Sequence, residues 1–168
     1  MLDRFTARAR RSIVLATEEA RSRRHESISP EHLLVGILRD GDGMAVKVLE
    51  RLQVPSEMLR ADVEHLLDGV PRSSMRPEPV FSPELRAVLQ AAVEARQQQS
   101  RLIGTEDLLL GLLSREGSEP NRVLRAAGVT FDAARGVISA FYNSVAVPIR
   151  AETIRAIARS KWGVQFDP

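Results

Sequence analysis

Apolar residues recur along the chain at the three- and four-residue spacing of amphipathic helices, and no segment alternates apolar and polar residues as a strand does. The pattern therefore predicts an all-α protein. Serine followed by proline, at Ser29-Pro30 and Ser82-Pro83, marks two helix starts, because serine caps a helix and proline is tolerated in its first turn. We expect helices over residues 5–23, 30–39, 43–52 and 56–67, and again over residues 82–98, 105–115, 119–127 and 131–142.

The helical pattern repeats itself at an offset of 75 residues. The segment from Ile28 to Leu38 returns from Ile103 to Leu113, whereas Phe5-Thr6 and Phe81-Ser82 align only with a slip of one residue. An internal repeat of this kind predicts two copies of one supersecondary unit, packed about a pseudo-twofold axis. A surface site should then exist twice, and differences between the copies indicate which of the two is functional.

The repeat divides the chain into four parts. Repeat 1 covers residues 1–67 and repeat 2 covers residues 81–142. Between them, residues 68–80 contain three prolines and no apolar periodicity, which is typical of a linker. The tail, residues 143–168, contains a further short helical stretch from Arg150 to about Ser160, for which the first copy has no counterpart.

Composition narrows the class of protein. An apolar fraction of 43% is enough for a core, while an aromatic fraction of 4% argues against a platform that stacks nucleic-acid bases. Lys47 and Lys161 are the only lysines among 24 basic residues, which we attribute to genome composition, since the net charge is only +2. No apolar run approaches the roughly 18 residues that span a bilayer, and the N-terminus has no signal-peptide core. We expect a cytoplasmic protein without a membrane partner.

The residues needed for catalysis are not arranged in any familiar pattern. Cysteine is absent, and the sequence contains neither a phosphate-binding P-loop nor a Gly-x-Ser-x-Gly motif. His25, His32 and His65 lack metal-binding spacing, so we expect surface or capping histidines and no metal site. Ser73 and Ser74 lie in the linker, where a nucleophile would lack rigid support. The sequence therefore predicts a protein that is not an enzyme and holds no cofactor.

Four segments carry a resemblance to a known family: Arg4-Phe5-Thr6, Glu18-Glu19-Ala20, Gly104 to Leu112 and Arg122-Val123-Leu124. Together they look like the Clp N-terminal repeat domain, most closely the N-domain of ClpC-type AAA+ unfoldases, over residues 1–142. The resemblance implies two tandem four-helix Clp repeats in a pseudo-twofold bundle, here with an extra C-terminal helix. In full-length relatives this domain precedes two ATPase modules and receives adaptors and substrates for the ClpP protease. If the chain is a natural full length, it lacks those modules and acts only by binding.

The resemblance also implies a ligand site. In ClpC-type relatives, the Glu at each such helix start resembles part of a pocket for phosphorylated arginine, a degradation mark. Gly104, Thr105 and Glu106 are the intact candidate by this resemblance, and Ser29 and Glu31 are the altered one. A helix start offers N–H groups and a positive dipole end to a phosphate, and a carboxylate can bind a guanidinium bidentately. Because proline between Ser29 and Glu31 removes one N–H, we expect the site of repeat 2 to be the better one. The helix dipole alone also favours acidic residues there, so a purely structural role stays open.

A second implied surface is a peptide groove. In actinobacterial relatives, aromatic residues equivalent to Leu2 and Phe81 line a groove that binds cyclic-peptide antibiotics. Leu2 is apolar but lacks an aromatic face. For Phe81 we favour the alternative of a staple that packs under the helix starting at Ser82, although both roles are compatible.

The leading hypothesis is a non-enzymatic protein- or peptide-binding module of the Clp chaperone–protease system. It would recognise substrate proteins, adaptors or phosphoarginine-type degrons, or dock on a ClpC-type unfoldase. One alternative is a decoy that sequesters cyclic peptides away from the unfoldase. Another is a nucleic-acid-binding regulator, which interspersed acidic residues argue against. Trp162 and Phe166 in the tail are candidates for a docking motif or for packing onto the bundle.

Overall fold

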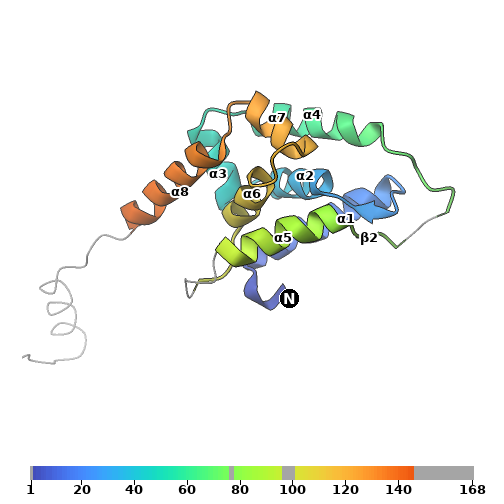
Figure 1. Ribbon diagram of the computed structural model, residues 1–168, viewed down its shortest axis with the longest axis horizontal. Coiled ribbons are helices and arrows are strands. Elements are labelled where there is room, and N and C mark those ends of the chain that lie inside the picture. The colour runs from blue at the N-terminus through green and yellow to red at the C-terminus, as the bar shows by residue number, and fades with distance from the viewer. Residues whose placement is uncertain (1, 76–77, 96–100, 146–168) are drawn as a thin grey trace, which may run out of the picture. The chain divides into compact units, whose positions relative to one another are not determined.

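The computed structural model describes residues 2–75, 78–95 and 101–145, and within these ranges the fold is all-α, as predicted (Figure 1). A 3-10 turn, η1 (Leu2–Arg4), precedes the first helix. The helices are α1 (Ala7–Ser22), α2 (Pro30–Asp40), α3 (Met44–Arg51), α4 (Ser56–Asp68), α5 (Pro83–Ala95), α6 (Thr105–Leu113), α7 (Glu119–Ala126) and α8 (Phe131–Val145). Residues up to Ile138 form one compact unit, and a second unit begins at Ser139 within α8.

Each of the eight helices expected up to residue 142 is present, with ends that differ by a few residues. The largest difference among the ends that the structure describes is at α8, which reaches Val145 rather than residue 142. Residues 96–100 and the helix expected from Arg150 to about Ser160, together with Trp162 and Phe166, lie outside the described residues.

Two short strands, β1 (Ser27–Ile28) and β2 (Val80–Phe81), were not predicted. They pair in parallel, with Ile28 opposite Phe81, and an isolated parallel bridge joins Phe5 to Ile103 in the same way. The amide after each phenylalanine donates to the isoleucine carbonyl, at 2.9 Å in one pairing and 3.0 Å in the other. Each repeat therefore contributes its start to a pairing with the other repeat, and these pairings hold the two copies together.

The residues that follow the two phenylalanines cap the next helices. The Thr6 hydroxyl accepts the Ala9 N–H at 3.1 Å, and the Ser82 hydroxyl accepts the Leu85 N–H at 3.1 Å. This matched chemistry explains why Phe5-Thr6 and Phe81-Ser82 correspond to each other despite the slip of one residue in the repeat.

The core is centred on α2, which contacts α1, α4, α5, α6 and α7 (Figure 1). A methyl group added at Gly36 of α2 would overlap the Ser12 carbonyl and lie 2.9 Å from the Ala16 nitrogen of α1. The counterpart in repeat 2 is Gly111, where the added carbon would lie 2.7 Å from the Val88 oxygen of α5. Both glycines therefore permit close helix packing. The buried core residues of α2 and α6 include Leu33, Leu34, Ile37, Leu108, Leu109 and Leu112.

Candidate functional site

The start of α6 brings together the three residues expected to form the intact site. Gly104 has extended backbone, and its N–H donates to Oδ2 of Asp107 at 2.8 Å, which fixes the first turn. The Thr105 hydroxyl accepts the N–H of Ala45 at 3.0 Å. Since Ala45 lies in the first turn of α3, Thr105 caps a helix of the other repeat. This side chain thus connects the candidate site to the interface between the repeats.

The carboxylate of Glu106 lies over Gly104. A methyl group at Gly104 would collide with the carboxylate in this position and would require the Glu106 side chain to move. The Glu106 residue is only 5% exposed, and its neighbours Thr105 and Asp107 are buried as well. A ligand at this helix start must therefore reach a covered carboxylate rather than an open one.

The start of α2 is built in the same way, with an imidazole in place of a carboxylate. The Ser29 N–H donates to Nδ1 of His32 at 3.0 Å, and the Ser29 hydroxyl lies 2.8 Å from the same nitrogen. At the 75-residue offset, His32 stands where Asp107 stands, so the two side chains perform the same capping role. Glu31, the counterpart of Glu106, is half-buried.

The imidazoles of His25 and His32 form a buried pair. Nδ1 of His25 lies 2.9 Å from Nε2 of His32, and the residues are 2% and 1% exposed. His25 is buried and caps no helix, so the expectation of a surface or capping histidine is wrong for this residue. His32 is also buried, but it does cap a helix, as expected. His65 is exposed. The signal for a buried histidine was the alignment of His32 with Asp107, a capping position in the first turn of α6.

The hydrogen bonds fix the protonation of this pair. A backbone N–H can only donate, so Nδ1 of His32 carries no proton, and its Nε2–H donates to His25. The proton of neutral His25 is then on Nε2, which is buried and forms no hydrogen bond of normal geometry with the described residues. Burial, followed by the charges of His25 and Arg23, lowers the pKa of His32 to about 4. Burial, followed by Arg23 and Arg72, also lowers the pKa of His25.

The Thr105–Ala45 hydrogen bond has no equivalent between the corresponding residues of the two repeats, Pro30 and Pro120. Pro30 is the counterpart of Thr105, and Pro120 is the counterpart of Ala45. Proline at residue 30 has no hydroxyl to accept a hydrogen bond, and proline at residue 120 has no N–H to donate one. Both prolines are buried at the starts of α2 and α7, which contact each other. The acceptor and the donor are thus missing together, which leaves no unpaired group.

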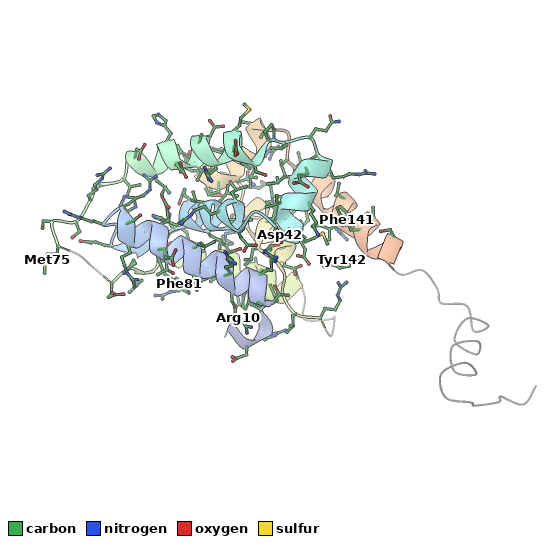
Figure 2. All side chains as sticks on the ribbon, turned by 180° about the vertical axis from the view of Figure 1, so that it is seen from behind. Arg10, Asp42, Met75, Phe81, Phe141 and Tyr142 are labelled. Carbon is green, nitrogen blue, oxygen red and sulfur yellow. The ribbon has the colours of Figure 1, made fainter. Side chains whose placement is uncertain are left out.

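The residues implied for the peptide groove lie at the N-terminal end and at the start of repeat 2. Leu2 belongs to η1, and Phe81 is half-buried in β2 (Figure 2). Phe81 pairs with Ile28 and directly precedes Ser82, which caps the start of α5. The role of Phe81 as a staple stays a prediction. The groove itself stays a prediction.

No group of three or more histidine, aspartate or glutamate side chains in the described ranges is arranged to hold a metal ion. None of the helices in that part of the chain has both the length and the apolar character needed to cross a membrane.

Comparison with known sequences gives a family match over residues 4–127, to the Clp repeat (R) N-terminal domain. The chain is 36% identical over 136 residues to the negative regulator of genetic competence ClpC/MecB of Bacillus subtilis, which covers 80% of this chain and 16% of that protein. It is 41% identical over 118 residues to a ClpA homologue of Guillardia theta, described as an ATP-binding subunit of the Clp protease, covering 70% and 14% respectively. The chain thus spans about a sixth or less of the length of these relatives.

Solved structures show the same fold. The N-terminal domain of ClpD from Arabidopsis thaliana matches with a TM-score of 0.61 and 26% identity, over 82% of this chain and 99% of that one. A ClpV N-domain in complex with a VipB peptide matches with a TM-score of 0.64 and 18% identity, over 78% and 82%. Because the family match spans most of the chain and reaches into both copies of the repeat, the chain belongs to the Clp repeat N-terminal domain family.

Proposed function

We propose that this chain is a binding module for proteins or peptides in a Clp chaperone–protease system. The observation that carries the proposal is the family match over residues 4–127, which includes both candidate helix starts. A ClpV N-domain of the same fold forms a complex with a VipB peptide, so this fold is able to present a peptide-binding surface. Binding adaptors or substrates for a ClpC-type unfoldase is the role that fits the relatives.

The finer proposal is that the start of α6 recognises phosphorylated arginine. The first-turn N–H groups and the helix dipole favour a phosphate, while the carboxylate of Glu106 suits a guanidinium. Glu106 lies over Gly104 and is covered, so binding requires this side chain to turn outward. At the start of α2, Pro30 removes one N–H and Glu31 is half-buried. We therefore propose one working site, in repeat 2.

Calorimetric titration with phosphoarginine tests this proposal, with phosphoserine and free arginine as ligand controls. The expected result is selective binding near one equivalent, lost in Glu106→Gln and kept in the matched variant Glu31→Gln. Thermal melting of each variant checks that the fold is intact. Binding near two equivalents would show that Pro30 is tolerated, and binding that survives in Glu106→Gln would remove this residue from the site.

Absence of phosphoarginine binding at millimolar concentration would reduce Glu106 to a residue that starts a helix. The broader role as a binding module would then depend on capture of a Clp adaptor or substrate at another surface. A pull-down with a purified ClpC-type unfoldase and its adaptors tests that role separately.

A further inference from the structure

A groove of about 390 Å³ lies between α4 and α7, which are in contact and run along the same side of the bundle (Figure 1). The volume is within the range of about 300–1,000 Å³ that is usual for ligand pockets. Most of the lining is apolar, and Met58 stands at its rim with 67% of its surface exposed. The lining residues are Gln53, Val54, Pro55, Met58, Leu59, Asp62, Val123, Ala126 and Ala127.

The counterparts of the groove's lining residues in the other copy of the repeat are of different size and polarity. The wall formed by Ala126 and Ala127 corresponds to Arg51 and Leu52 in repeat 1, where longer side chains would fill the space. The opposite wall changes too, since Met58 and Asp62 correspond to an alanine and a valine at residues 133 and 137. Small residues on one wall and a long apolar residue and a carboxylate on the other are thus particular to this side of the pseudo-twofold.

The backbone at the groove also differs between the two repeats. Gln53 has a φ of 60°, in the left-handed region that disfavours residues with a side chain, and its counterpart in repeat 2 is Gly128, with a φ of 87°. Repeat 1 therefore keeps a side chain at a position where glycine is the less strained residue. Gln53 lines the groove, so the strained backbone lies at the same place where the two repeats differ in their side chains.

The charge of the groove indicates what kind of segment fits it. Asp62 is the only charged lining residue; it is exposed, and it has no ion pair with any described residue. Of the neighbouring charges on the two helices, Arg60 pairs with Glu64 and Arg122 with Glu119, whereas Glu57 and Arg125 form no ion pair with a described residue. An incoming segment thus meets apolar walls and one unneutralised carboxylate, which suits a basic residue next to an apolar one.

We propose that the α4–α7 groove binds a peptide segment of a partner protein in which a large apolar side chain is followed by arginine or lysine. The apolar side chain fills the space left by Ala126 and Ala127, and the basic residue pairs with Asp62. This inference rests on the proposed role as a protein-binding module, but it assigns a surface whose lining includes no residue of the α2 or α6 starts.

The test is a nuclear magnetic resonance titration of the ¹⁵N-labelled full chain with pentapeptides acetyl-Gly-X-Arg-Gly-Gly-amide, in which X is Leu, Ile, Met or Phe. The expected result is a shift of the backbone amide signals of Gln53, Met58, Asp62 and Ala127. Replacing arginine by glutamate in the peptide should weaken binding at least tenfold, because the glutamate would repel Asp62. The signal of Gly104 should not move, which separates this groove from the proposed phosphoarginine site.

Two variants complete the test. Ala127→Leu places in repeat 2 the residue that repeat 1 carries at position 52, so the fold is expected to tolerate it, and binding should be lost. Asp62→Asn should remove the preference for arginine over glutamate, whereas Asp132→Asn, a matched change of an exposed acid outside the groove, should leave it unchanged. Intact signal dispersion in the spectrum of each variant confirms folding.

Three results would overturn the groove proposal. They are the absence of shifts with all four peptides at millimolar concentration, unchanged binding in Ala127→Leu, and shifts confined to residues 104–107. Concentration-dependent shifts of the groove signals without peptide would assign the surface to a second copy of this chain instead. Shifts confined to residues 104–107 would place arginine binding at the α6 start, whereas the other results leave phosphoarginine binding to be judged by its own titration.

Discussion

Mild acidification should destabilise this domain through the buried His25–His32 pair. The pKa of His32 is lowered from 6.5 to about 4, chiefly by burial and then by the charges of His25 and Arg23. Between these two pH values the unfolded chain binds a proton that the folded chain does not bind. The stabilising effect of neutral His32 is therefore complete above about pH 6.5 and is lost as the pH falls toward 4.

The size of the effect follows from the difference in pKa. One pKa unit corresponds to about 1.4 kcal/mol, so the full shift is worth roughly 3 kcal/mol, of which roughly 2 kcal/mol is lost by pH 5. The lowered pKa of His25 acts in the same direction. The pKa values of Asp68 and Glu84 are lowered from 3.8 and 4.5, by hydrogen bonds to Arg23 and to the Glu84 backbone respectively. The stability from these carboxylates is lost mainly below about pH 4.5, so it contributes little to the change between pH 7.5 and pH 5.

Urea unfolding at pH 7.5 and pH 5.0 measures the effect directly. The matched variants are His32→Asn, which keeps an acceptor for the Ser29 N–H but does not titrate, and His65→Asn on exposed α4 surface. The decrease in the free energy of unfolding from pH 7.5 to pH 5.0 should be smaller in His32→Asn than in the natural chain, and unchanged in His65→Asn. Equal stability of the natural chain at both pH values, or an undiminished loss in His32→Asn, would refute the reasoning.

Two other predictions concern stability and are checked by denaturant unfolding at pH 7.5. Gly36→Ala should destabilise the domain by roughly 2–3 kcal/mol because its methyl group would overlap the Ser12 carbonyl, whereas Gly136→Ala, with no atom within 4 Å, should stabilise it by about 0.5–1 kcal/mol. Thr105→Val should lower the free energy of unfolding by roughly 1–3 kcal/mol because the Ala45 N–H loses its acceptor. Thr105→Ser keeps the hydroxyl and should lower it much less. Equal effects within either pair would contradict the assigned contacts.

The sequence predicted the helices well because their signals are local. A serine before a proline and a glycine after a helix act over one turn, and the 3.6-residue period extends over each helix. The strands at Ile28 and Phe81 were missed because a two-residue strand has no alternation to detect. Their partners lie some fifty residues apart in the chain, and only the packing of the two repeats brings them together.

The candidate site was predictable only in part, for a similar reason. Gly104, Thr105 and Glu106 are contiguous, so their proximity needed no knowledge of the fold. That the Thr105 hydroxyl caps α3, and that Glu106 is covered, depends on how the two repeats meet. The capping role of His32 was within reach of sequence reasoning, since the repeat aligns it with an aspartate.

The differences between the two copies argue for a division of roles rather than for two equal sites. At the α6 start, the cap is a carboxylate and the first turn keeps its N–H groups, so an anionic ligand finds donors there at any pH near neutral. At the α2 start, Pro30 removes a donor, and the cap is an imidazole that must stay neutral. In the α4–α7 groove, repeat 1 provides Gln53, Met58 and Asp62, and these side chains have no equivalent in repeat 2. We thus propose an anionic ligand at the α6 start of repeat 2 and an apolar, basic segment at the α4–α7 groove, which residues of both repeats line.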